Sequence, residues 1–208
     1  MSAPRHAARR RVIAFDNRGV GASGGSTPDT IETMARDAVL FIRRLVRKVI
    51  LAGTGPAGGP GIDKVTALTL RDILKGFLTR KDPKQFLFFT DTEHGRREAH
   101  AFLERLKERT DRRDKAISLR SFRAQPKAIH RWGLQPPADL SRIRQPVLVA
   151  NGESDRTVPS ENTLDLAARL PQGELVPLYP DAGHGGIFQF HDEFVARALA
   201  FLEARPDA

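Results

Sequence analysis

The chain has 208 residues, of which 40% are hydrophobic and 28% are charged, a balance typical of a globular domain rather than a disordered segment. It contains no cysteine, which excludes disulfides and thiolate chemistry. No apolar run is long enough to span a membrane or to form a signal-peptide core. We therefore expect a cytoplasmic protein without a membrane partner.

The net charge of +9 does not by itself indicate nucleic-acid binding. The basic residues are mixed with acidic ones, as in HGRREAHAFLERLKERTDRRDK (94–115). No RNA-recognition or zinc-finger motif accompanies them. We expect solvated basic faces rather than a nucleic-acid site.

The N-terminal part predicts a strand, a helix and a second strand. RVIAFD (11–16) and VRKVILA (46–52) are apolar runs of strand length. Between them, residues 30–45 place apolar side chains at helical spacing, with Asp29 or Thr30 available as the N-cap. This helix would form the right-handed crossover between two parallel strands.

Residues 62–135 have a different pattern, because they are charged and mostly helical. The candidate helices lie near 63–80, 83–90, 94–113 and 114–130. This stretch is too long for an ordinary connection between a strand and the next element. We predict a helical cap at 60–135, inserted into a core formed by 1–59 and 136–208.

The C-terminal part returns to alternating strands and helices. Strands are predicted near 146–151 and 175–179, a short helix at 163–170 and a terminal amphipathic helix at 191–204. Buried strands that alternate with helices favour a mainly parallel sheet covered on both faces. The predicted fold class is α/β.

Two side chains with catalytic potential follow these last two strands. Asp155 lies in GESDRTVP (152–159) and His184 lies in DAGHGG (181–186). The carboxyl ends of parallel strands share one edge of the sheet, so the two side chains should lie side by side. A carboxylate beside an imidazole fixes its tautomer and stabilises its cationic form.

Four segments carry a resemblance to a known family. RVIAFDNRGVGASGGS, VRKVILAGTGP, PVLVANGESDRTVPS and YPDAGHGGIFQ resemble landmarks of the α/β-hydrolase superfamily, in the family's order. Among its branches, the chain is similar to the esterase, lactonase and non-haem haloperoxidase-like enzymes with a helical cap. The resemblance implies hydrolysis of small, apolar ester-like or lactone substrates by a Ser-His-Asp triad, with His184 as general base and acid and Asp155 as its orienting group.

GASGG (21–25) matches G-x-S-x-G, the pattern of a nucleophile elbow. An elbow requires a helix directly after the serine, whereas the two glycines after Ser23 and the nearby Pro28 make a poor helix start. The resemblance places Ser23 in the family's D-x-R-G-x-G-x-S loop, which does not carry the nucleophile. We therefore do not assign Ser23 as the nucleophile.

The nucleophile elbow itself is expected to be missing. In the family, a strand, the elbow and a helix lie between segments that resemble 30–45 and 46–52. Here Leu45 is followed directly by Val46, without the roughly 25–35 residues that such a unit needs. We expect weak or absent activity; the alternatives are a non-catalytic relative that binds a small ligand or a partner, or a truncated gene product.

Thr54, in LAGTGP, is the one substitute nucleophile that the pattern offers, because it follows a strand at the edge that should face His184. The glycines around it and Pro56 favour a loop that lines the cleft instead. Its surroundings, GTGPAG (53–58), also match a dinucleotide fingerprint, but no helix is expected to open there. We predict no bound cofactor.

A metal site is not predicted either. Glu93, His94 and His100 lie close together in the sequence, but in a charged helical stretch without a recognised ligand spacing. A solvated helix face accounts for these three residues.

Overall fold

The computed structural model describes residues 18–19, 23–42, 47–108, 110 and 118–204. The strand predicted at 11–16 and the Leu45–Val46 junction lie outside the described residues. The described elements, in chain order, are α1 (Ile31–Ile42), β1 (Val49–Ala52), the 3-10 helix η2 (Ile62–Lys64), α2 (Val65–Thr79), α3 (Pro83–Phe88), α4 (Glu93–Glu108), α5 (Leu119–Gly133), β2 (Val147–Ala150), α6 (Glu161–Arg169), β3 (Gly173–Leu175), α7 (Gly186–Gln189) and α8 (His191–Glu203).

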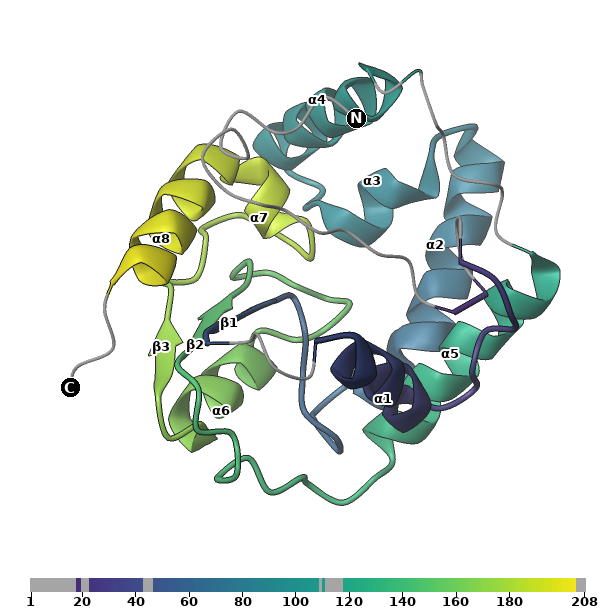
Figure 1. The fold of residues 1–208 in the computed structure, drawn as a ribbon. Coiled ribbons are helices and arrows are strands. Elements are labelled where there is room, and N and C mark those ends of the chain that lie inside the picture. Colours follow the sequence, from purple (N-terminus) through teal and green to yellow (C-terminus); the bar gives the residue numbers. More distant parts are fainter. Residues whose placement is uncertain (1–17, 20–22, 43–46, 109, 111–117, 205–208) are drawn as a thin grey trace.

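The described strands form one parallel sheet in the order β1-β2-β3 (Figure 1). Val147 of β2 lies opposite Val49 of β1 and Gly173 of β3. This arrangement, with helices around the sheet, confirms the predicted α/β class with a reduced, mainly parallel sheet.

The third strand begins earlier than predicted. The sequence placed it at 175–179, whereas β3 ends at Leu175. The chain still runs beside β2 after this point, because Val176 N and Tyr179 N donate to carbonyls of residues 149 and 151. Pro177 interrupts the ladder, since it has no N–H to donate.

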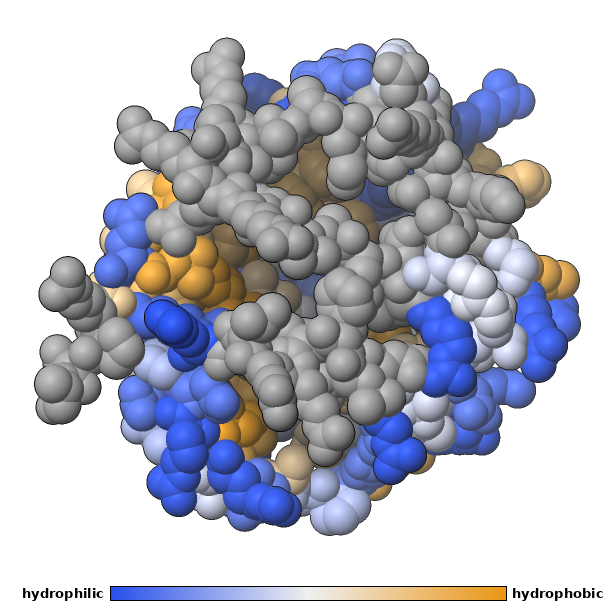
Figure 2. Space-filling view, viewed as in Figure 1, coloured by the Kyte–Doolittle hydropathy of each residue, from blue (hydrophilic) through white to orange (hydrophobic). Residues whose placement is uncertain are grey.

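β2 is buried on both faces. Leu148 and Ala150 face a cluster on the α8 side, completed by Val176, Tyr179, Ala182 and Phe201. Val147 and Val149 face the opposite side, where they pack against Leu166 and Leu170 of the α6 region. Figure 2 shows hydrophobic residues (orange) beside α8 and the sheet, and hydrophilic residues around α6. The core is therefore divided by β2 into two clusters.

β1 is only half-buried. Its residues Val49 and Leu51 join the α6-side cluster and Ile50 joins the α8-side cluster, each as a partly buried member. Within the described part of the chain, β1 pairs with β2 alone. Its other edge has no described partner strand.

The helices α2 to α5, within the predicted cap segment, pack against one another. α2 contacts α3 and α5, and α3 contacts α4. In Figure 1 these helices lie above and to the right of the three strands. A separate cluster joins Phe89 to Ala99 and Phe102 of α4. No helix among the described residues is long and apolar enough to cross a membrane.

Two predicted helix boundaries can be assigned to capping residues. The α1 helix begins after Thr30, whose hydroxyl accepts from Thr33 N at 3.3 Å. The helix predicted at 114–130 begins later, because Ser118 is its N-cap and accepts from Ser121 N at 3.1 Å. A side-chain acceptor in this position satisfies an N–H group that the helix leaves free.

Candidate active site

Asp155 and His184 are brought together at the carboxyl ends of β2 and β3, as the sequence predicted. His184 Nδ1 lies 2.9 Å from Asp155 Oδ2. The Asp155 side chain is fully buried and the His184 side chain is 25% exposed. The imidazole is therefore held from the protein interior and remains reachable from outside.

The Asp155 carboxylate is fixed by its own loop. Its Oδ1 atom accepts hydrogen bonds from Thr157 N at 2.8 Å and from Val158 N at 3.0 Å, which closes a turn typical of aspartate. These two bonds and the His184 contact offset the cost of burying the carboxylate. The other oxygen, Oδ2, is left to contact His184.

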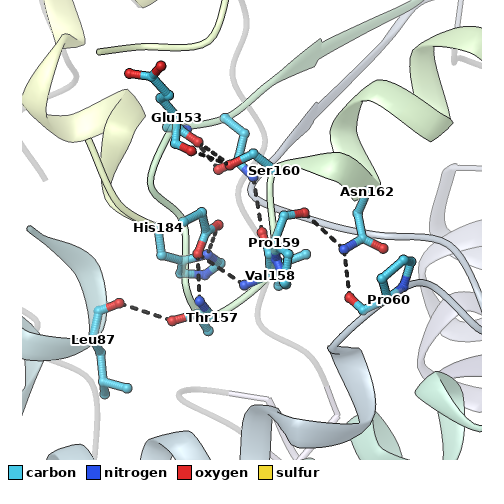
Figure 3. Close-up of polar contacts among 12 residues, drawn as sticks. Pro60, Leu87, Glu153, Thr157, Val158, Pro159, Ser160, Asn162 and His184 are labelled. Atoms are coloured by element: carbon cyan, nitrogen blue, oxygen red, sulfur yellow. Dashed lines mark hydrogen bonds and ion pairs between the residues drawn. The ribbon is translucent and has the colours of Figure 1, made fainter. Parts of the chain in front are cut away.

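The end of α3 holds both loops of the site. The carbonyls of residues 86–88 lie in the last turn of this helix, where backbone acceptors have no partner within the helix. Their donors are, in order, Arg156 Nη2 (2.7 Å), Thr157 Oγ1 (3.0 Å, Figure 3) and Gly185 N (2.7 Å). Arg156 and Thr157 follow Asp155, and Gly185 follows His184. The same short helix therefore positions both members of the pair.

An ion pair that was not predicted from the sequence reinforces this contact. Arg156 Nη2 lies 2.7 Å from Asp72 Oδ2. The Asp72 side chain is 4% exposed, on α2, whereas Arg156 is half exposed. The signal in the sequence was the single acidic residue of the helix VTALTLRDILKGFLT.

The His184 loop is also bound to α4. Thr92 Oγ1 donates to Asp181 Oδ2 at 2.7 Å. This hydrogen bond lowers the pKa of Asp181, and Thr90 and His94 act in the same direction. His94 Nδ1 lies 3.3 Å from the same carboxylate oxygen, so this histidine belongs to the loop contact.

The loop after β1 approaches the imidazole. Gly53 has φ = +57°, and a Cβ at this position would lie 3.2 Å from His184 Nδ1. The next residue, Thr54, is half-buried, and among the described residues no hydrogen bond joins it to His184. The Trp132 indole donates to the carbonyl of Gly55 at 3.2 Å. GTGPAG lies between β1 and η2 and is an irregular loop, as predicted, because no helix begins within it.

Ser23 does not lie in an elbow. Gly19 N donates to the carbonyl of Gly24 at 3.0 Å, so these two glycines lie close together. No helix follows the serine directly, because α1 begins at Ile31. The loop is bound to α5 instead, through a 2.7 Å hydrogen bond between the hydroxyls of Thr27 and Ser121.

Comparison with known proteins identifies the fold family. The model of the alpha/beta hydrolase family matches residues 3–198. An alpha/beta hydrolase fold protein from Chitinophaga pinensis is 33% identical, with a TM-score of 0.82, over 92% of this chain and 78% of that one.

Two more distant structures share the fold. A bromoperoxidase from Bacillus anthracis is 19% identical, with a TM-score of 0.64, over 91% of this chain and 80% of that one. A thermophilic esterase from Thermogutta terrifontis is 18% identical, with a TM-score of 0.58, over 90% of this chain and 77% of that one. The family model and the Chitinophaga structure each cover most of the chain, and the sheet and its flanking helices agree with both. The protein belongs to the alpha/beta hydrolase family.

Proposed function

We propose that Asp155 and His184 form the acid–base part of a hydrolytic site for small ester or lactone substrates, in a chain that lacks the serine nucleophile. The observation that carries this proposal is the fully buried Asp155, which aims one oxygen at His184 Nδ1 from 2.9 Å while backbone groups hold the other. This arrangement keeps the proton on Nδ1 and leaves Nε2 to accept one.

The expected chemistry follows from this orientation. His184 Nε2 takes a proton from the attacking water, Asp155 stabilises the resulting imidazolium, and the proton then passes to the leaving group as the bond between it and the carbonyl carbon breaks. Without a serine, no acyl-enzyme intermediate forms, so water must attack directly. We therefore expect weak or absent turnover.

The state of β1 supports a missing nucleophile segment. In the family, a strand, the elbow and a helix come before the segment that corresponds to β1. In the described residues, β1 is half-buried and has no partner on its outer edge. The half-burial of β1 is compatible with the loss of a neighbouring interior strand.

A non-catalytic ligand-binding role is the second candidate, and a cleft favours it. A cavity of about 330 Å³ lies against both loops of the site, where it is lined by Ser154 and Gly183. Phe89 and Ala99 line its apolar side. This volume is within the range of small-molecule pockets.

Hydrolysis of p-nitrophenyl acetate and labelling by a fluorophosphonate probe test the proposal together. If hydrolysis occurs, we expect it to be slow and to be abolished by His184→Ala. His191 is an exposed histidine on α8, and the control His191→Ala should leave the rate unchanged. We expect no covalent labelling. A label that maps to Ser23 or Thr54, and that is lost when the labelled residue is replaced by Ala, would overturn the proposal that the chain lacks a nucleophile.

Hydrolysis and thermal-shift measurements distinguish the hydrolytic role from the ligand-binding role. Hydrolysis that survives His184→Ala would remove this residue from the mechanism. No hydrolysis by the wild type, combined with a thermal shift on adding a non-hydrolysable ester analogue, would favour the ligand-binding role instead.

A further inference from the structure

Helix α2 exposes its apolar side. It buries Val65, Asp72 and Gly76. Its exposed apolar side chains are Leu70 (56%), Leu74 (57%), Phe77 (80%) and Leu78 (71%), here named the α2 apolar stripe. At about 100° per residue these four positions fall within a sector of about 100°, opposite the buried ones. This is the reverse of a surface helix that packs its apolar side on a core.

The apolar surface continues from α2 to α5. A groove of about 540 Å³ lies between the two helices, and Leu70, Phe122 and Pro126 are among the residues that line it. A second hollow, of about 710 Å³, lies at the other end of the stripe beside Phe77 and Leu78. The stripe and these hollows form one surface, here named the α2–α5 face.

Basic residues surround this face. The exposed ones are Lys64, Arg71, Lys75, Arg80, Lys81, Arg120, Arg123 and Lys127. α5 contains no acidic residue, and the one acid of α2, Asp72, is buried and paired with Arg156. The acids nearby are Asp63, which lines the groove, Asp82, which is paired with Lys84 beside the second hollow, and Asp91, which lies 3.9 Å from Lys75.

The far side of α5 adds a basic hollow. Its volume is about 820 Å³, and Arg120, Arg123 and Lys127 line it together with Arg131, which is paired with Asp29. Figure 2 shows hydrophilic residues over this side of the molecule. Arg123 and Lys127 line both this hollow and the apolar groove, so apolar and cationic surface are adjacent along one helix.

We propose that the α2–α5 face docks on an anionic membrane surface, with the α2 apolar stripe entering the headgroup boundary and the basic rim contacting lipid phosphates. Exposed apolar residues with Lys and Arg beside them are the pattern of interfacial binding. A second copy of the chain would complement this face poorly, because a two-fold contact brings the same basic rim against itself.

This proposal differs from the expectation of no membrane partner. That expectation rested on the lack of a membrane-spanning segment, which does not bear on docking at the interface. The proposal is independent of the Asp155–His184 pair and of any hydrolytic activity.

Co-sedimentation with lipid vesicles tests the proposal. We expect the protein to pellet with phosphatidylcholine vesicles that contain phosphatidylglycerol, to remain in solution with phosphatidylcholine alone, and to dissociate as salt is raised. Leu74→Asp should weaken binding at least about tenfold, because it places a charge in the apolar boundary. Leu164→Asp, at a 45% exposed leucine of α6, is the matched control and should bind as the wild type does.

A second pair of variants tests the basic rim. Replacing both Arg123 and Lys127 by Gln should weaken binding about fivefold for each charge lost. The same change at Arg142 and Arg144, which are exposed near β2, should have little effect. Equal binding to neutral and anionic vesicles, or a dimer in solution that Leu74→Asp dissociates, would overturn the proposal.

Discussion

β1 and β2 have nearly the same sequence and very different environments. β1 is VILA and β2 is VLVA. Every residue of β2 is at most 1% exposed, whereas all four residues of β1 are partly exposed. β2 has a strand on each edge and a cluster on each face, while β1 has one described partner. Position in the sheet, rather than composition, determines how much stability each strand contributes.

The same contrast divides the site. The loop after β2 is held by the hydrogen bonds of Asp155 and by the end of α3, and the loop after β3 shares that helix end through Gly185. The loop after β1 contributes the close approach of Gly53 to His184. The two loops that share the end of α3 therefore carry the acid–base pair.

The largest expected effect comes from matched leucines in the two strands. Leu148→Ala in β2 should lower the free energy of unfolding by about 2–5 kcal/mol, because it leaves a cavity in a closed core. Leu51→Ala in β1 should cost about 1 kcal/mol, since this side chain is partly exposed. Urea unfolding measures both. Equal losses of unfolding free energy in the two variants would contradict the difference in burial between β1 and β2, and would show that β1 is covered in solution.

Removing the cation that pairs with Asp72 should have the next largest effect. Arg156→Gln leaves Asp72 buried without its partner, at a cost of about 1–3 kcal/mol, reduced from the value for fully buried pairs because Arg156 is half exposed. Asp72→Asn in the same chain should recover part of this loss. Arg197→Gln, which breaks an exposed pair with Glu193, is the control and should cost about 0.5 kcal/mol or less.

A smaller effect is expected at the end of β1. Gly53→Ala should cost about 1 kcal/mol or more, because alanine disfavours φ = +57° and its Cβ would lie 3.1 Å from His184 Cε1. The Cε1 proton resonance of His184 should shift with it. Gly24→Ala, where a Cβ would meet nothing within 4 Å, is the control. An unchanged His184 resonance would argue against contact between this loop and the imidazole.

The smallest effect concerns the acid-side stability of the His184 loop. The Thr92 hydroxyl lowers the pKa of Asp181 from its ordinary value of 3.8. The ionised carboxylate therefore stabilises the fold above that value, and this contribution is lost as the pH falls through the lower pKa of the folded state. Asp181→Asn should be less stable than the wild type at neutral pH, and urea midpoints should converge in acid. A constant difference across this range would refute the assignment.

The site could be predicted from the sequence because its two residues follow strand ends. Asp155 and His184 each lie in the loop that follows a recognisable apolar run, and parallel strands align such loops at one edge. The Asp72–Arg156 pair could not be predicted in this way, because its members are 84 residues apart and no period links a helix face to a distant loop. The start of β3 was missed because the apolar pattern of residues 175–179 identifies buried side chains, whereas the strand is defined by backbone pairing.

The sequence by itself determined the α/β class, since strand and helix periods are local. The resemblance of its strand-end motifs to the family's landmarks indicated the family, which the comparisons show. Only the tertiary structure decided which apolar residues are buried. α2 has the composition of an amphipathic helix, and its sequence does not tell which side faces the protein. Packing around Asp72 turns its leucines outward, and the neighbours in the sheet bury β2 and leave β1 partly exposed. Burial depends on what surrounds an element, and the surroundings come from distant parts of the chain.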